Sequence, residues 1–167
     1  MYQRALVTTD GSELSLVVFP HVRHVVDPAG TIIVVEVVDT VARLLARTTP
    51  AGFEYGTSAG FKSQMIEQMV ESQRTAATEH LERAQAALTQ ASDTLAHDGF
   101  RNVETLILSG LPGDAIVQAA KERDCDIVLM ATHGRSGLRR AVIGSVADHV
   151  LRHLDGIPIL LVRPSEG

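Results

Sequence analysis

Residues 126–149 are DIVLMATHGRSGLRRAVIGSVADH, in which an aliphatic run, a glycine-containing loop and a helical pattern follow one another. The run from Asp126 to Ala131 shows no clean alternation of polar and apolar residues. Continuous apolar runs suit strands that are buried on both faces, as in a parallel sheet covered by helices. The segment therefore predicts a buried strand, a loop and a helix that begins at Gly144-Ser145.

Four further runs of the same kind lie elsewhere in the chain, at Ala5–Thr9, Thr31–Val38, Val103–Leu108 and Ile157–Val162. Helical patterns separate them, so strands and helices alternate along the sequence. Right-handed crossovers between parallel strands limit the topologies that such an alternation can adopt. We expect one α/β domain over residues 1–167, with a doubly wound, five-stranded parallel sheet of order 3-2-1-4-5 and helices on both faces.

The helical segments carry local signals of their own. Ser12 is a candidate N-cap for the first helix, and Pro20 is expected to kink or split it. Residues 62–95 form a long helical pattern of roughly 50 Å, which must bend around the body or project from it. Its alanine-rich stripe favours packing on the sheet over a coiled coil. In residues 40–61 the apolar residues follow neither a helical nor a strand period. We predict a mobile insertion there, either a plain connection or a lid over a ligand.

Composition excludes several classes of protein. The net charge is −5, whereas a nucleic-acid-binding domain would carry a basic footprint. The single cysteine, Cys125, rules out an intramolecular disulfide and is expected to be buried at the entry to a strand. No apolar run is long enough to span a membrane, and the first residues lack a signal-peptide pattern. These features predict a cytoplasmic protein.

The loop and helix start after Ala131 have the chemistry of an anion site. Glycines allow a phosphate to approach the backbone closely, and the first N–H groups of a helix point towards it. Ser145 adds a hydroxyl at the helix cap. Arg135, Arg139 and Arg140 either add positive charge or form a solvated face. The P-loop pattern and G-x-G-x-x-G after the first strand are both absent, and Leu138 breaks the nucleophile-elbow pattern G-x-S-x-G.

The same segment resembles the signature G-x2-G-x9-G-[ST] of the universal stress protein family, which marks the family's ATP-binding branch. It aligns here as Ala131-x2-Gly134-x9-Gly144-Ser145, with alanine in place of the first glycine. VTTDGS at residues 7–12 is similar to the family's V-P-T-D-G-S, with Thr8 in place of proline. Residues 34–39 and 158–163 resemble its second and closing strands, so the likeness covers about residues 3–164.

The resemblance implies an ATP site, with AMP and ADP as alternative ligands and Mg²⁺ or Mn²⁺ accompanying the nucleotide. It places Asp10 near the ribose and backbone groups of Val37 near the adenine. Taken alone, Asp10-Gly11-Ser12 also fits a plain turn and helix cap, but an acid at the carboxyl end of the first strand lies at the crevice where ligands bind. Glycines 134 and 144, together with Ser145 and Val146, would hold the phosphates, and Ala131 and His133 would flank the nucleoside. The full set of expected nucleotide-binding residues is Thr9, Asp10, Val37, Met130, Ala131, His133, Gly134, Arg135, Gly144, Ser145 and Val146.

The function expected from these features is that of a stress-response regulator in which bound ATP is a slow switch for an unidentified protein partner. The apolar closing strand, residues 157–162, is expected at a sheet edge, and the resemblance implies homodimers. Two alternatives remain open. One is a slow ATPase or other ATP-using enzyme, for which His133 is the one candidate base. The other is a nucleotide-free interaction module of the same family.

Two histidine pairs have helical spacings that suit metal binding, His21 with His24 and His149 with His153. No carboxylate or cysteine completes either set in the sequence pattern. We therefore predict no metal site at these histidines.

Overall fold

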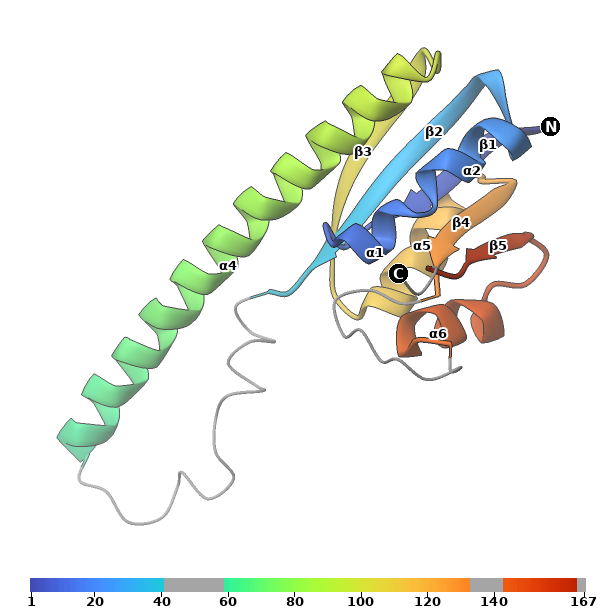
Figure 1. The fold of residues 1–167 in the computed structure, drawn as a ribbon. Helices are drawn as coiled ribbons and strands as arrows, with labels where there is room; N and C mark the ends of the chain where they lie inside the picture. The colour runs from blue at the N-terminus through green and yellow to red at the C-terminus, as the bar shows by residue number, and fades with distance from the viewer. Residues whose placement is uncertain (41–58, 133–142, 165–167) are drawn as a thin grey trace.

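The computed structural model describes residues 1–40, 59–132 and 143–164 (Figure 1). In the described ranges the five strands form one parallel sheet of order β3-β2-β1-β4-β5, as predicted from the sequence. The elements in chain order are β1 (Tyr2–Thr8), α1 (Glu13–Leu16), α2 (Phe19–Val25), β2 (Val26–Val38), α4 (Ala59–His97), β3 (Asn102–Ser109), α5 (Pro112–Glu122), β4 (Ile127–Ala131), α6 (Ser145–His153) and β5 (Ile159–Val162).

Helices cover both faces of the sheet and enclose two apolar cores. Alternate residues of β1 divide between them, with Ala5 and Val7 in one core and Leu6 in the other. Helices α2 and α4 complete the first core, while α5 and α6 complete the second. Because both faces of the central strands are buried, their sequences are continuously apolar instead of alternating.

The first helical segment is split ahead of Pro20, as the sequence predicts. Ser12 caps α1, where its side chain accepts a hydrogen bond from the Ser15 N–H. Helix α2 begins at Phe19, so Pro20 lies in its first turn, where the missing N–H has no intrahelical acceptor to lose. The proline therefore starts the second helix and does not interrupt it.

Strand β2 begins earlier than the sequence predicts, at Val26 and not at Thr31. Between two register pairs β1 advances from residue 2 to 4 while β2 advances from 26 to 31, so β2 bulges. At the end of this bulge a Cβ on Gly30 would lie 2.7 Å from the backbone oxygen of Gln3. Glycine is required here by the close approach of β1.

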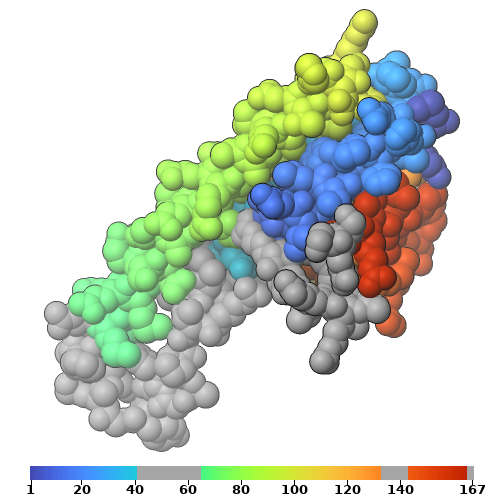
Figure 2. All heavy atoms as spheres, in the orientation of Figure 1, coloured from blue at the N-terminus to red at the C-terminus, as the bar shows by residue number. Residues whose placement is uncertain are grey.

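Helix α4 is longer than the sheet it covers, and only its C-terminal part packs on the core. Ala84, Leu88, Ala91 and Leu95 are buried, whereas Ile66 is 47% exposed. Figures 1 and 2 show the N-terminal part of the helix extending beyond the body. The sequence left bending and projection open, and the structure shows projection.

Two contacts mark the limits of the C-terminal part of α4 that packs on the core, which we call its docked part. Near its start, His80 Nε2 lies 3.9 Å from Oε1 of Glu36, a β2 residue that is only 1% exposed. At its end, Gly99 adopts a φ of 98°, and the Phe100 N–H donates to the oxygen of Leu95 at 3.1 Å. This left-handed glycine and its i−5 hydrogen bond form a Schellman motif, which stops the helix.

Cys125 precedes β4 and is buried in the second core, as predicted. Burial raises the pKa of its thiol to about 11, because the charged thiolate would be poorly solvated there. A thiol in this state is a packing residue and a weak nucleophile.

None of the described helices is long and apolar enough to cross a membrane.

Candidate functional site

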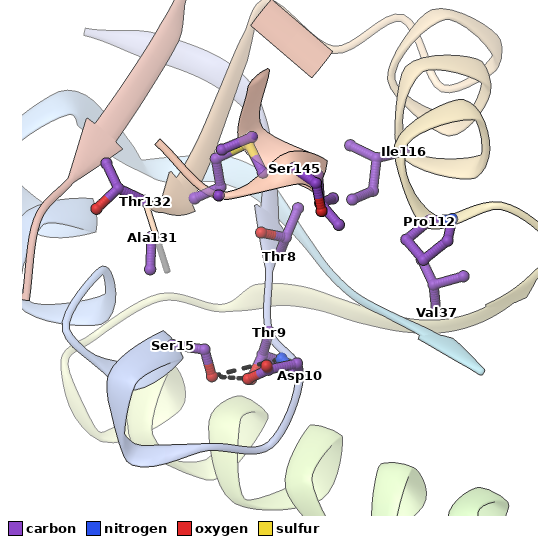
Figure 3. A pocket seen from close by; sticks show the side chains of 14 residues that line it. Thr8, Thr9, Asp10, Ser15, Val37, Pro112, Ile116, Ala131, Thr132 and Ser145 are labelled. Atoms are coloured by element: carbon purple, nitrogen blue, oxygen red, sulfur yellow. Dashed lines mark hydrogen bonds between the residues drawn. The ribbon is translucent and has the colours of Figure 1, made fainter. Parts of the chain in front are cut away.

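A pocket of about 290 Å³ opens at the carboxyl ends of β1 and β4 (Figure 3). Ligands of open α/β sheets bind at this edge, where the connections on the two sides of the central strand diverge. Its lining comes from five regions of the chain. The lining residues are Thr8, Thr9, Asp10, Ser15, Val37, Pro112, Ile116, Met130, Ala131, Thr132, Gly144, Ser145, Val146 and Ala147.

The start of α6 forms one wall of the pocket. Gly144 is the N-cap and has an extended conformation, and as a glycine it has no side chain that could provide a capping hydrogen bond. Its own N–H donates to the oxygen of Thr132 at 2.8 Å, which ties the helix start to the end of β4. Four consecutive residues from the N-cap onward, 144–147, line the pocket. The first N–H groups of a helix lack intrahelical acceptors, so this wall favours an anion.

The helix start differs in one detail from the sequence prediction. Ser145 is the first helical residue, and Gly144 rather than Ser145 occupies the cap position. The Ser145 side chain lies on the pocket wall and is exposed (Figure 3). Its hydroxyl is thus not used as a helix cap.

The loop after β1 forms the opposite wall through a connected set of hydrogen bonds (Figure 3). The Ser15 hydroxyl donates to the backbone oxygen of Ser12 at 2.7 Å. Because that bond uses its only proton, the 2.9 Å contact between the Thr9 and Ser15 hydroxyls requires Thr9 to donate. The Thr9 oxygen accepts from the Gly11 N–H at 3.1 Å, and the Asp10 N–H approaches Ser15 Oγ at 3.4 Å.

The carboxylate of Asp10 belongs to the same loop. Its Oδ1 accepts from both the N–H and the hydroxyl of Ser12, at 3.1 and 2.6 Å. The sequence left two roles open for Asp10, a turn former and a ligand contact. The geometry is compatible with both, because the side chain holds the turn and also lines the pocket.

Apolar side chains complete the pocket between these two walls. Val37 comes from the end of β2, Met130 from β4, and Pro112 and Ile116 from α5. A cavity with apolar walls and a few convergent polar groups is typical of small-molecule sites, although this one lies at the lower end of their volumes of about 300–1,000 Å³.

All the predicted nucleotide-binding residues that the structure describes line this one pocket. They are Thr9, Asp10, Val37, Met130, Ala131, Gly144, Ser145 and Val146. His133, Gly134 and Arg135 lie outside the described residues, as do Arg139, Arg140 and residues 41–58 of the predicted insertion.

Sequence reasoning missed several lining residues, among them Ser15, Pro112 and Thr132. A signal existed for two of them. Ser15 follows the cap Ser12 by three residues, so it returns to the side of the helix that faces the strand end. Pro112 opens the helix after the third strand, whose carboxyl end lies at the same edge of the sheet. Ile116, one turn later, follows from the same placement.

The histidine pairs do not form a metal centre in the described parts of the chain, where no three His, Cys, Asp or Glu side chains gather around a common point. His149 instead contacts Asp114 of α5, with Nε2 and Oδ1 separated by 2.7 Å. His153 stacks on the ring of His149, with centroids 4.1 Å apart.

Known proteins of similar sequence and fold agree on one family. The universal stress protein MJ0577 of Methanocaldococcus jannaschii is 27% identical over 164 residues, which covers 98% of this chain and 96% of that protein. Its structure matches with a TM-score of 0.70 and 23% identity, covering 100% of this chain and 99% of that one.

Two ligand-bound structures share the fold. A universal stress protein in complex with cAMP matches with a TM-score of 0.61 and 22% identity, covering 98% of each chain. An Arabidopsis thaliana family member with AMP bound matches with a TM-score of 0.52 and 15% identity, covering 98% of this chain and 92% of that one. The model of the universal stress protein family matches residues 1–163. This chain therefore belongs to the universal stress protein family.

Proposed function

We propose that this protein binds ATP in the pocket between β1 and α6, and that the bound nucleotide is a slow switch for interaction with a protein partner. The observation that carries the proposal is the wall made by residues 144–147, a helix start with glycine at its N-cap that faces a pocket whose opposite wall holds Asp10. The cAMP and AMP complexes of proteins with this fold support an adenine nucleotide. AMP and ADP are alternative ligands.

In this arrangement the phosphates lie at Gly144, Ser145 and Val146, where backbone N–H groups and a hydroxyl are available. The nucleoside lies towards Asp10 and Val37. Because no cluster of carboxylates for a cation is present in the described residues, Mg²⁺ or Mn²⁺ would bind mainly through the phosphates and water.

Titration calorimetry of ATP against the wild type and variants tests the proposal. Ser145→Ala removes a hydrogen bond to a charged group, which costs about 1.5–3 kcal/mol and weakens binding roughly ten- to hundredfold. Gly144→Val should be worse, because a branched side chain occupies the approach of the phosphate. Ser72→Ala, an exposed serine on α4, is the matched control and should bind as the wild type does. A wild type without ATP binding contradicts the proposal.

Slow turnover is part of the proposed switch. Of the described lining residues Asp10 alone is ionisable, and its Oδ1 is engaged by Ser12. Fast phosphoryl transfer needs a group that orients water or the attacking hydroxyl. We expect turnover well below the usual enzyme range of about 1–10³ s⁻¹. A steady-state assay with Mg²⁺ and Mn²⁺ that finds turnover in that range, abolished by His133→Ala, would favour the enzyme alternative.

We also propose that the protein is a cytoplasmic homodimer. The support is β5, which lies at a sheet edge with Ile159, Leu160 and Leu161 partly exposed. An apolar edge strand of this kind favours pairing with a second copy.

A further inference from the structure

The ring of His149 occupies the space where Gly113 would carry a side chain. A Cβ built on Gly113 would lie 2.5 Å from Cδ2, 2.6 Å from Cγ and 2.9 Å from Cβ of His149. Helices α5 and α6 therefore approach each other closely at a point where α5 has no side chain. This contact lies outside the pocket lining, and the proposed function does not use it.

Rotating the histidine side chain would relieve this contact only in part. Rotation moves Cδ2 and Cγ, but the backbone of α6 fixes Cβ, which still lies 2.9 Å from the added carbon. A larger residue at position 113 would therefore have to displace one helix against the other. Close-packed interiors transmit such displacements instead of absorbing them.

Two further contacts hold the ring in place. Its Nε2 atom is inaccessible to water and lies 2.7 Å from Asp114 Oδ1, although without the alignment of a hydrogen bond. His153 stacks on it at an interplanar angle of 20°, and Nδ1 of His153 lies 2.8 Å from the backbone oxygen of His149. A contact with a carboxylate that is 57% exposed contributes little by itself. The steric fit against Gly113 is the larger effect.

On each of the two helices, a residue close to this contact lines the pocket. Pro112, the neighbour of Gly113, lines it, and so does Ser145, one helical turn or about 6 Å before His149. A change in the spacing of α5 and α6 at His149 therefore moves the helix start against the α5 wall.

We propose that His149 is a positioning residue, which with Gly113 sets the distance between the α5 wall and the start of α6 and thereby the affinity for nucleotide phosphates. The inference rests on the proposed function, because it assigns a determinant of affinity to that same pocket. Hydrogen bonds to a ligand require positions accurate to a few tenths of an ångström, so a small helix displacement is enough to weaken binding.

Helix propensity alone predicts a favourable effect of Gly113→Ala, on the stability of α5 and not on ATP binding. Alanine is favoured over glycine within helices, so Gly113→Ala should make α5 more stable if nothing else changed. The contact with His149 instead predicts weaker ATP binding. The two effects are separable, because one acts on folding and the other on affinity.

The experiment is a double-substitution cycle on Gly113→Ala and His149→Ala, with ATP affinity measured by calorimetry and stability by urea unfolding. We expect Gly113→Ala to weaken binding about tenfold, equal to ~1.4 kcal/mol. The double variant, in which Cγ and the ring are removed, should recover most of this loss. If Gly113 and His149 served folding alone, the substitutions would change the urea midpoint, and adding His149→Ala would not restore the ATP affinity lost in Gly113→Ala.

Arg152→Ala is the matched control, since it breaks the Asp148–Arg152 ion pair within α6 without touching α5. It should leave ATP affinity unchanged. If the wild type binds ATP and both single variants bind equally well, the positioning role is wrong while the proposed function stands. If the wild type does not bind, both are wrong. Should Gly113→Ala fail to fold, His149→Ala carries the test alone, and its unchanged affinity would overturn the inference.

Discussion

The two halves of the sheet, on either side of β1, are held together differently. On one side β2 pairs with β3 without interruption from Thr31 to Val38, and the docked part of α4 covers both strands. On the other side β4 and β5 pair only from Val128 to Ala131 and from Ile159 to Val162. The pocket wall of α6 and the partly exposed edge strand belong to this second half.

This difference separates stability from function. The first half buries long aliphatic strands under a long helix, and burial of apolar surface is the dominant favourable contribution to folding. The second half presents a helix start and a strand edge, which are the features that bind ligands and partners. Substitutions in the first half should therefore change the free energy of unfolding, and those in the second should change binding and assembly.

The largest effect on folding is expected at Leu95 of α4, which is 0% exposed in the first core. Leu95→Ala leaves a cavity and should lower the free energy of unfolding by about 2–5 kcal/mol. Ile66→Ala, on the projecting part of the same helix, should change it by less than about 0.5 kcal/mol. Urea denaturation of both variants measures the contrast. Equal losses would mean that the projecting part of α4 is as firmly held as the docked part.

A smaller effect is expected where the two halves meet, at the end of β1. Ser15 is 4% exposed and accepts hydrogen bonds from Thr9 and from the Asp10 N–H. Ser15→Ala leaves the buried Thr9 hydroxyl without its acceptor, which costs about 1–3 kcal/mol of stability. It also releases the loop that carries Asp10, so affinity for ATP should fall as well.

The distinguishing measurement for Ser15 is discrimination between ATP and 2′-deoxy-ATP, because Asp10 is expected near the ribose. Loss of stability alone would weaken both nucleotides equally. A reduced preference for ATP indicates that the loop position matters for recognition. The exposed Ser72→Ala is again the control, and an unchanged preference in Ser15→Ala would show that the network serves folding only.

The fold was predictable because each signal in the sequence had one dominant cause. Continuous aliphatic runs such as Asp126–Ala131 arise where both faces of a strand are buried, and Pro20 allowed only a kink or a new helix start. The start of β2 was not predictable, because residues 27–30 carry turn-forming residues while Val26 still pairs with Tyr2 across the bulge. Local turn propensity was outweighed there by the neighbouring strand.

The candidate site was predictable where it depends on backbone geometry, and less so where it depends on packing. Gly144 and Asp10 were found because glycine spacing and an acid at a strand end are local patterns. The contact between His149 and Gly113 joins two helices, and no local pattern connects them. His149 and His153 were instead considered as a metal pair, because helical spacing alone does not say which helix lies opposite.

The smallest effect on folding, yet a complete change of assembly, is expected at the edge strand of the second half. Leu160 lies on β5 and is partly exposed. Leu160→Glu places a carboxylate in the proposed interface, and two-fold symmetry brings it in twice, so like charges and lost apolar burial both oppose pairing. Light scattering after size exclusion should find a dimer for the wild type and a monomer for the variant.

Leu151→Glu, an exposed residue of α6, is the control and should remain dimeric. Because Leu160 also packs partly on the first core, urea unfolding must show that the variant is folded, and Leu161→Glu repeats the test from the other face of the strand. A wild type that stays monomeric at all accessible concentrations would remove β5 as an interface and leave the pocket as the one functional feature of this half.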